Sequence, residues 1–233
     1  MREALQSLLE NSSNRNVSEE ILSFDEYLQL VQQEPWVTRD TFQLLHDMLL
    51  SSGVDHAISP GKPIKHHYQF FENSDRVGAY VVFGQQKAKE NLVEKINNAS
   101  RGLEASKRLW ILLGPPGAAK SRSMEGIKLA LKQYSQSEEG KTHTLLLPTV
   151  DKRLRDQALF EEEGIFYLQS PLFEKPLQVL PEETRKAFAS EIVNGTDQKI
   201  LKEWLLNHPH YDKEFSITIS GRLSPYSEYI LRD

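Results

Sequence analysis

Hydrophobic positions recur at helical spacing in two stretches near the N-terminus, residues 23–34 and 38–53. The first stretch opens with Ser23, which can cap a helix, and Glu26, which can complete a capping box. Its apolar face consists of Phe24, Leu28 and Val31. The apolar face of the second stretch consists of Phe42, Leu45 and Leu49. Pro35 separates the two stretches, so the pattern predicts a helical hairpin.

The central part of the chain alternates between short apolar runs and amphipathic stretches. The run LWILL at residues 109–113 is typical of a strand that is buried on both faces in a parallel sheet. Helical periodicity precedes it at residues 87–98 and follows it at residues 120–134. Shorter apolar runs predict strands at residues 79–83, 143–147 and 165–168. This order of elements predicts an α/β fold built on a parallel sheet.

The remaining segments carry weaker signals. Short or charged helices are expected at four places: residues 1–10, residues 151–163, a helix that starts at residue 181, and residues 200–206. The third of these is opened by Pro181, with Glu182 and Glu183 placed at the positive end of the helix dipole. Loops are expected at residues 55–66, and irregular or short-stranded structure from residue 215 onward.

The composition excludes several classes of ligand and of chemistry. The 233 residues are 39% hydrophobic and 26% charged, with a net charge of -5, which argues against nucleic acid as the main ligand. The chain has no cysteine, so disulfides, thiolate metal sites and cysteine nucleophiles are excluded. We find neither the apolar core of a signal peptide nor an apolar run of roughly 20 residues. We therefore expect a cytoplasmic protein without a membrane segment.

His56, His66 and His67 are the densest group of potential metal ligands. Neighbouring residues on a strand point to opposite faces, so His66 and His67 cannot both face one ion. No carboxylate stands at ligand spacing beside them. The pattern therefore does not predict a metal site here.

The sequence GPPGAAKS, residues 114–121, follows the apolar run directly. It fits the phosphate-loop pattern G-x-x-x-x-G-K-[ST] at Gly114, Lys120 and Ser121, whereas Ala119 replaces the second glycine. In such a loop the lysine reaches the β- and γ-phosphates and the hydroxyl holds Mg²⁺, so Ser121 is the candidate metal ligand. The amides expected to line the phosphates belong to Gly117, Ala118 and Ala119. The strand–loop–helix context favours a nucleotide site over a chance match.

Two observations leave the strength of this site open. A methyl group at Ala119 reduces clearance, and it costs more if φ is positive there, whereas alanine is acceptable in a helical conformation. Hydrolysis also needs a carboxylate for Mg²⁺ at the end of a second strand. The nearest matches, residues 145–151 and 179–183, are interrupted by proline. The loop could thus be a functioning site, a weakened one or a relic that only connects strand to helix.

Several segments, taken in order, resemble one known family. They are residues 23–35 (SFDEYLQLVQQEP), 66–96 (from HHYQFF to VEKI), 107–121 (KRLWILLGPPGAAKS), 130–140 (ALKQYSQSEEG) and 170–188 (SPLFEKPLQVLPEETRKAF). Together they are similar to the PrkA serine protein kinase family, in its N-terminal AAA-type ATP-binding domain. The resemblance implies a P-loop core with a parallel sheet, preceded by an N-terminal helical segment, and ATP and Mg²⁺ as ligands. It also implies that Gly84 and Gln85 lie beside the nucleotide base, and that the module can assemble into homo-oligomeric rings.

The departures from the family pattern shape the remaining expectations. Serines stand in GRLSPYS, residues 221–227, where the family often has cysteines. The family's acidic strand and kinase-like region would lie beyond this sequence. We therefore expect a helical hairpin and linker at residues 1–66 and a partial AAA-type P-loop domain at residues 67–233, truncated before the kinase region. No catalytic residue and no protein substrate can be assigned. The alternative is a non-catalytic protein-interaction module with a weakened or relic nucleotide loop.

Overall fold

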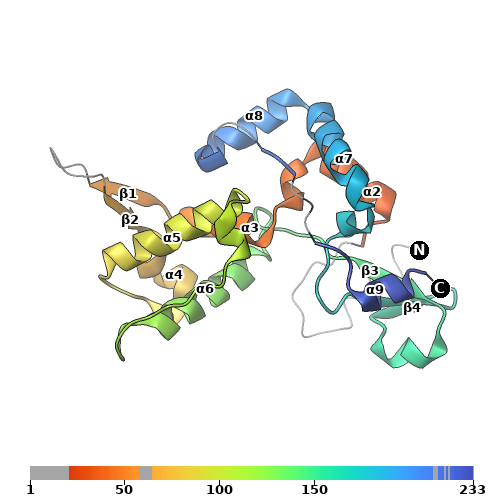
Figure 1. Ribbon diagram of the computed structural model, residues 1–233, viewed down its shortest axis with the longest axis horizontal. Coiled ribbons are helices and arrows are strands. Elements are labelled where there is room, and N and C mark those ends of the chain that lie inside the picture. Colours follow the sequence, from red (N-terminus) through yellow and green to blue (C-terminus); the bar gives the residue numbers. More distant parts are fainter. Residues whose placement is uncertain (1–20, 58–64, 212–214, 218, 220, 233) are drawn as a thin grey trace.

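The computed structural model describes residues 21–57, 65–211, 215–217, 219 and 221–232 (Figure 1). The α-helices in this part of the chain are α2 (Phe24–Gln33), α3 (Thr41–Leu50), α4 (Ser74–Val77), α5 (Gln86–Ser100), α6 (Lys120–Tyr134), α7 (Glu182–Gly195), α8 (Gln198–Asn207) and α9 (Pro225–Ile230). The strands are β1 (Val54–Ala57), β2 (Lys65–Tyr68), β3 (Leu146–Thr149), β4 (Phe160–Glu162) and β5 (Ile165–Gln169). The helix expected at residues 1–10 lies outside the described residues.

The helix predictions that rest on strong end signals are confirmed. Ser23 and Glu26 form the expected capping box at the start of α2. Helix α6 occupies the predicted residues 120–134, and α5, α7 and α8 lie where helical periodicity placed them. Helix α3 begins at Thr41 rather than Thr38, because Asp40 caps it and forms a capping box with Gln43.

The described strands form antiparallel sheets, so the predicted parallel sheet is not confirmed. Strands β1 and β2 overlap the two ends of the loop that was predicted at residues 55–66, and their pairing corrects that prediction. A second sheet has the strand order β3-β5-β4, with both pairs antiparallel. The run at residues 109–113 is not a strand, because no described strand lies beside it to accept and donate the ladder hydrogen bonds that would hold it extended.

Three other expectations are corrected. The charged stretch 151–163 is a 3-10 turn, η5 (Lys152–Gln157), followed by β4, because Glu163 and Gly164 with φ of 51° and 83° make a tight turn into β5. The strand expected at 79–83 is the turn η3 (Gly78–Tyr80) and irregular chain. The C-terminal tail contains α9, which Ser224 caps.

Two main hydrophobic cores divide the helices between them (Figure 1). The first lies among α3, α5 and α6 and includes Met48, Leu49, Phe70, Phe71, Val93, Ile96, Ile127 and Tyr134. The second lies among α2, α7 and α8 and includes Tyr27, Val31, Leu177, Ala189, Ile192, Leu201 and Phe215. A small third core under the sheet comprises Leu147, Leu168 and Ile230. Helices α2 and α3 therefore belong to different cores rather than packing together, and the domain boundary at residue 66 stays a prediction.

Candidate functional site

The loop at residues 114–121 ends in an open helix N-terminus. The turn around Gly117 has φ of 78°, and Ala119, the N-cap of α6, has φ of 52°. No side chain caps α6, so its first backbone N–H groups keep the capacity to bind an anion. The alanine thus carries a methyl group in the left-handed region, which is the costlier of the two conformations considered above. The loop is largely exposed to solvent.

Lys120 reaches back across this loop. Its Nζ donates to the carbonyl oxygens of Gly114 and Pro115, both at 2.8 Å. The ammonium is therefore placed over the same turn whose amides precede α6. A cation beside an uncapped helix N-terminus on one small exposed turn is what a phosphate group requires. The Ala118 N–H of this turn donates to the Pro115 carbonyl at 3.3 Å, a bond that a phosphate would have to replace.

Ser121 is exposed in the first turn of α6, beside this lysine. Its hydroxyl is an oxygen donor of the kind that Mg²⁺ prefers, so it fits the predicted role in part. No carboxylate of the described residues forms an ion pair with Lys120, and no group of three or more His, Asp or Glu side chains there could hold a metal. Ser121 is therefore the one residue to which we assign a bond to Mg²⁺, and that assignment stays a prediction.

The second predicted segment, Gly84 and Gln85, opens helix α5. Gly84 has φ of 71° and Gln85, the N-cap, has φ of 54°. Arg122 of α6 ties the preceding chain to the loop helix: its Nε donates to the Val81 carbonyl at 3.0 Å and its Nη2 to the Ala79 carbonyl. Both predicted segments are therefore helix N-termini with left-handed caps, and they belong to one packed unit.

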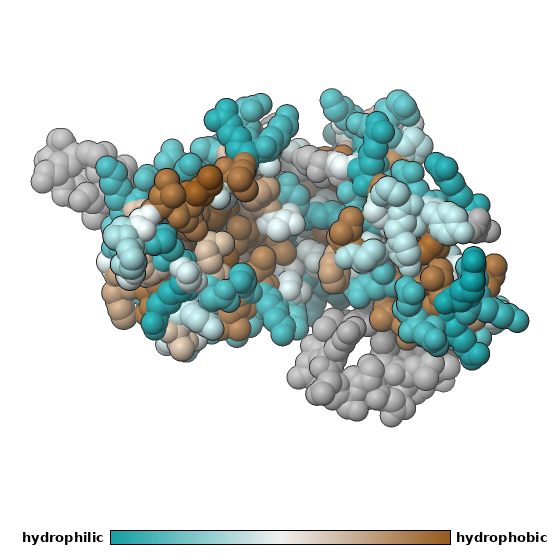
Figure 2. Space-filling view, turned by 60° about the horizontal axis from the view of Figure 1, so that its bottom comes forward, coloured by the Kyte–Doolittle hydropathy of each residue, from teal (hydrophilic) through white to brown (hydrophobic). Residues whose placement is uncertain are grey.

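The chain entering the loop is apolar and exposed. The exposed fractions of Leu109, Ile111 and Leu113 are 87%, 70% and 88%. Figure 2 shows apolar side chains gathered on the surface of the part that contains α5 and α6. Trp110 alone of this run is anchored, with its indole N–H donating to the Ala105 carbonyl at 2.9 Å. A run this apolar on both faces is suited to burial, and the described residues leave it uncovered.

A buried polar cluster surrounds Asp47 of α3, and the sequence did not predict it. We call it the Asp47 cluster: Arg39, Asp47, His210 and Tyr211. The carboxylate of Asp47 accepts hydrogen bonds from Arg39, from His210 Nε2 at 2.5 Å and from the Tyr211 hydroxyl at 3.2 Å. Arg39 also donates to the carbonyl of Glu139, in the turn after α6. No spacing signal could have found this cluster, because His210 and Tyr211 are 163 and 164 positions from Asp47 in the sequence.

The electrostatics of this cluster follow from burial. Burial opposes ionisation of Asp47, yet the hydrogen bond from His210 and the charge of Arg39 hold the pKa of the carboxyl below its usual value. Burial, together with the nearby His210, lowers the pKa of His46 to about 4. The arrangement joins segments of both cores, and no described nucleophile bonds to His210, so we assign it a structural role.

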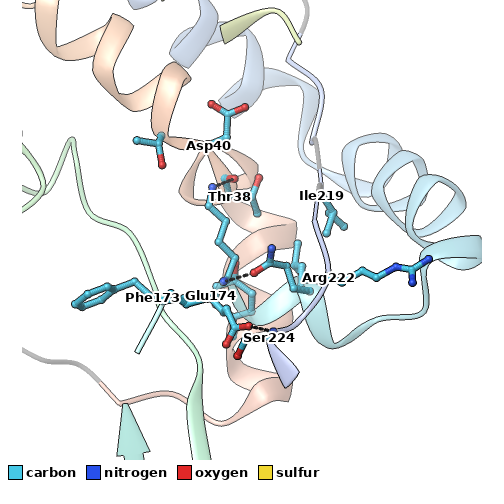
Figure 3. A pocket seen from close by; sticks show the side chains of 13 residues that line it. Thr38, Asp40, Phe173, Glu174, Ile219, Arg222 and Ser224 are labelled. Atoms are coloured by element: carbon cyan, nitrogen blue, oxygen red, sulfur yellow. Dashed lines mark hydrogen bonds between the residues drawn. The ribbon is translucent and has the colours of Figure 1, made fainter. Parts of the chain in front are cut away.

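A separate pocket of about 330 Å³ lies away from the loop, between the start of α3 and the chain after β5 (Figure 3). Burial lowers the pKa of Lys175 to about 8, and its Nζ donates to the Thr38 carbonyl at 3.0 Å. The neighbouring Glu174 is buried and accepts from Ser170, Ser224 and Ser227. The pocket therefore sets a buried carboxylate beside its lysine, and this negative charge disfavours a phosphate there.

Comparisons with known proteins identify the family of this chain. Residues 22–202 match the family model described as PrkA AAA domain. A relative, the ATP-dependent protease PrkA of Bacillus subtilis (strain 168), is 24% identical over 170 residues. The match covers 72% of this chain and 22% of the relative, so the chain spans about a fifth of that protein's length. No solved structure matches the chain significantly.

Proposed function

The chain belongs to the PrkA AAA-domain family, and on this premise we propose that residues 114–121 bind the phosphates of ATP. The family assignment supports an AAA-type ATP-binding module. The observation that carries the assignment to these residues is the position of Lys120, whose ammonium lies across the turn that leads into the uncapped N-terminus of α6. No helix among the described residues is long and apolar enough to cross a membrane.

In this proposal each residue has a distinct task. Lys120 exchanges its two carbonyl partners for phosphate oxygens. The backbone N–H groups of Gly117, Ala118 and Ala119 line the phosphates, and the Ala118 N–H gives up its bond to the Pro115 carbonyl to do so. Ser121 holds Mg²⁺, and Gly84 and Gln85 lie beside the base. Bound MgATP supplies the phosphoanhydride whose cleavage would drive work. Ring assembly and a cytoplasmic location stay predictions.

The activity of a larger protein is a separate question. The resemblance stated above implies a serine protein kinase system, whereas the printed name of the relative describes an ATP-dependent protease. The described residues contain no assigned catalytic group for either reaction. For this chain we therefore propose ATP binding, and neither phosphoryl transfer nor proteolysis. Either reaction would need catalytic groups from further polypeptide.

The test is calorimetric titration of the chain with ATP and ADP in the presence of Mg²⁺. Lys120→Ala should weaken binding about tenfold or more, because a hydrogen bond to a charged group contributes about 1.5–3 kcal/mol. Lys128→Ala is the matched control, since Lys128 lies on the same helix and pairs with Glu125 at 2.6 Å. Ser121→Ala should reduce the gain in affinity that Mg²⁺ confers.

One outcome would favour the alternative function. If wild-type protein binds neither nucleotide, the loop is a relic in this chain. The better proposal is then the alternative function, a non-catalytic protein-interaction module. The exposed apolar run at residues 109–113 favours that alternative, because it offers a surface that a partner could cover. Equal affinity of wild type and Lys120→Ala for ATP would instead show that the nucleotide binds at another site.

A further inference from the structure

The hairpin of β1 and β2 brings together two histidines that are ten positions apart. His56 and His66 are directly opposite each other in the antiparallel register, so their side chains project from the same face. Their Nδ1 atoms are 3.0 Å apart, and the rings meet edge to face with centroids 5.0 Å apart. His66 and His67 point to opposite faces of β2, as neighbours on a strand do, whereas His56 and His66 are brought together across the two strands.

His67 shows what a fully engaged histidine looks like on the same strand. Its Nδ1 lies 3.1 Å from Gln86 Oε1, and its Nε2 lies 3.5 Å from a Glu72 oxygen. The rings of His56 and His66, in contrast, have each other as their hydrogen-bond partner among the described residues. Both rings are accessible to solvent, so water molecules can reach the two facing nitrogens.

The separation of the two nitrogens suits a shared metal ion. Imidazole nitrogens bind Zn²⁺ at about 2.0–2.1 Å, so two ligands at right angles lie about 3 Å apart, and a tetrahedral pair only slightly further. The carboxylate of Glu90 lies beside the pair, accepting from the backbone N–H of His66 at 2.9 Å, and contributes negative charge. The distance between the two nitrogens is therefore already that of two ligands on one ion, and the rings would turn so that both lone pairs point at it.

We propose that His56 and His66 form a site for one transition-metal ion of the class that prefers imidazole, with water completing its coordination. Cu²⁺ should bind more tightly than Zn²⁺, following the general order of affinity for such ligands. Because no described group of three or more potential ligands exists here, the site should be weaker than a structural zinc site. The proposal is independent of nucleotide binding.

The ion would tie β1 to β2 where the hairpin needs support. A two-stranded hairpin is marginal on its own. Helix α5 supports the β2 side of the hairpin through Gln86, which donates to the His66 carbonyl, and through Glu90. A metal across the strands would add a bond that holds β1 as well, and it would stabilise the folded hairpin by mass action.

The experiment is calorimetric titration of the full chain, free of any histidine tag, with ZnCl₂ and CuCl₂. We expect one site in wild type and a loss of affinity of about tenfold or more in His56→Ala and in His66→Ala, since removing even an outer-shell partner of a metal ligand costs about 10–100-fold. His67→Ala is the matched control and should retain the site. Electron paramagnetic resonance of the Cu²⁺ complex should show two nitrogen ligands, falling to one in each single variant.

Three outcomes would overturn the proposal. The first is the absence of any site in wild type at millimolar metal, which would leave the pair as a hydrogen bond alone. The second is equal affinity in wild type and in both alanine variants, which would mean an adventitious ion only, bound at other side chains. The third is loss of the site in His67→Ala to the same extent, which would place the ion elsewhere on the hairpin. Circular dichroism of each variant checks that the exposed substitutions leave the fold intact.

Discussion

The phosphate loop and the Asp47 cluster each place a cation against backbone carbonyls, and they do so in opposite ways. Lys120 contacts Gly114 and Pro115, its near neighbours in the sequence, on an exposed turn. Arg39 is 2% exposed and reaches Glu139, a hundred positions away. The first arrangement can release its partners to a ligand at little cost, whereas the second cannot lose a partner without leaving a charge buried. The contrast separates a site built to exchange contacts from one built to keep them.

The most severe test of this contrast is Asp47→Asn. The substitution leaves the buried guanidinium of Arg39 without its counter-ion, so we expect the free energy of unfolding to fall by about 3–5 kcal/mol. Chemical denaturation followed by circular dichroism measures the change. Glu125→Gln breaks an exposed pair with Lys128 and should cost less than about 0.5 kcal/mol. Similar losses in the two variants would show that the cluster is not buried as described.

The second test uses pH. The folded state keeps the buried His46 neutral until the pH reaches about 4, whereas the unfolded state takes up the proton near pH 6.5. Stability should therefore fall as the pH is lowered from about 6.5 to about 4, by up to about 1.4 kcal/mol per pH unit. Asp47, whose pKa is lowered, adds a loss at still lower pH. Denaturation at several pH values should show that the stability of His46→Gln depends less steeply on pH than that of wild type. An equal pH dependence would show that His46 does not cause the loss of stability.

The loop provides the third test, through Ala119. Its φ of 52° costs an alanine about 1–2 kcal/mol, and glycine avoids this cost while losing about 0.4–1 kcal/mol through the unfolded chain. We expect Ala119→Gly to stabilise the protein by up to about 1 kcal/mol, and to increase affinity for ATP. Ala118 lacks a positive φ, so Ala118→Gly should destabilise instead. Urea denaturation and calorimetry measure both effects, and the same sign in both variants would contradict the assigned backbone.

The smallest effect is expected in the apolar run. Leu113 is 88% exposed, so Leu113→Ser should change the free energy of unfolding by less than about 0.5 kcal/mol. Leu147, which is fully buried, gives the comparison, since Leu147→Ala should cost about 2–5 kcal/mol. Thermal or urea unfolding measures the change in the free energy of unfolding for both variants. A cost above about 2 kcal/mol for Leu113→Ser would mean that this segment is covered in solution.

Helix positions were largely predictable because their signals are local. Ser23 with Glu26 and the periodicity of residues 120–134 involve neighbours within a few positions, and both predictions are confirmed. Strand pairing was not predictable in the same way. Residues 109–113 have the composition of a buried strand, but a strand exists only if another is placed beside it. The β4–β5 turn at Glu163 and Gly164 was a local signal that helical composition obscured.

The candidate site likewise has features that local sequence predicts and features that depend on long-range contacts. The sequence by itself was enough to propose residues 114–121 as a phosphate loop, since the glycines, lysine and serine of the pattern lie close together and the helix after them is set by periodicity. It also determined the resemblance that the family match confirms. Only the tertiary structure decided that Ala119 takes a left-handed conformation, that Asp47 meets His210, and that His56 faces His66. Backbone strain and long-range contacts depend on how the chain packs, and packing is a property of the whole fold rather than of any short segment.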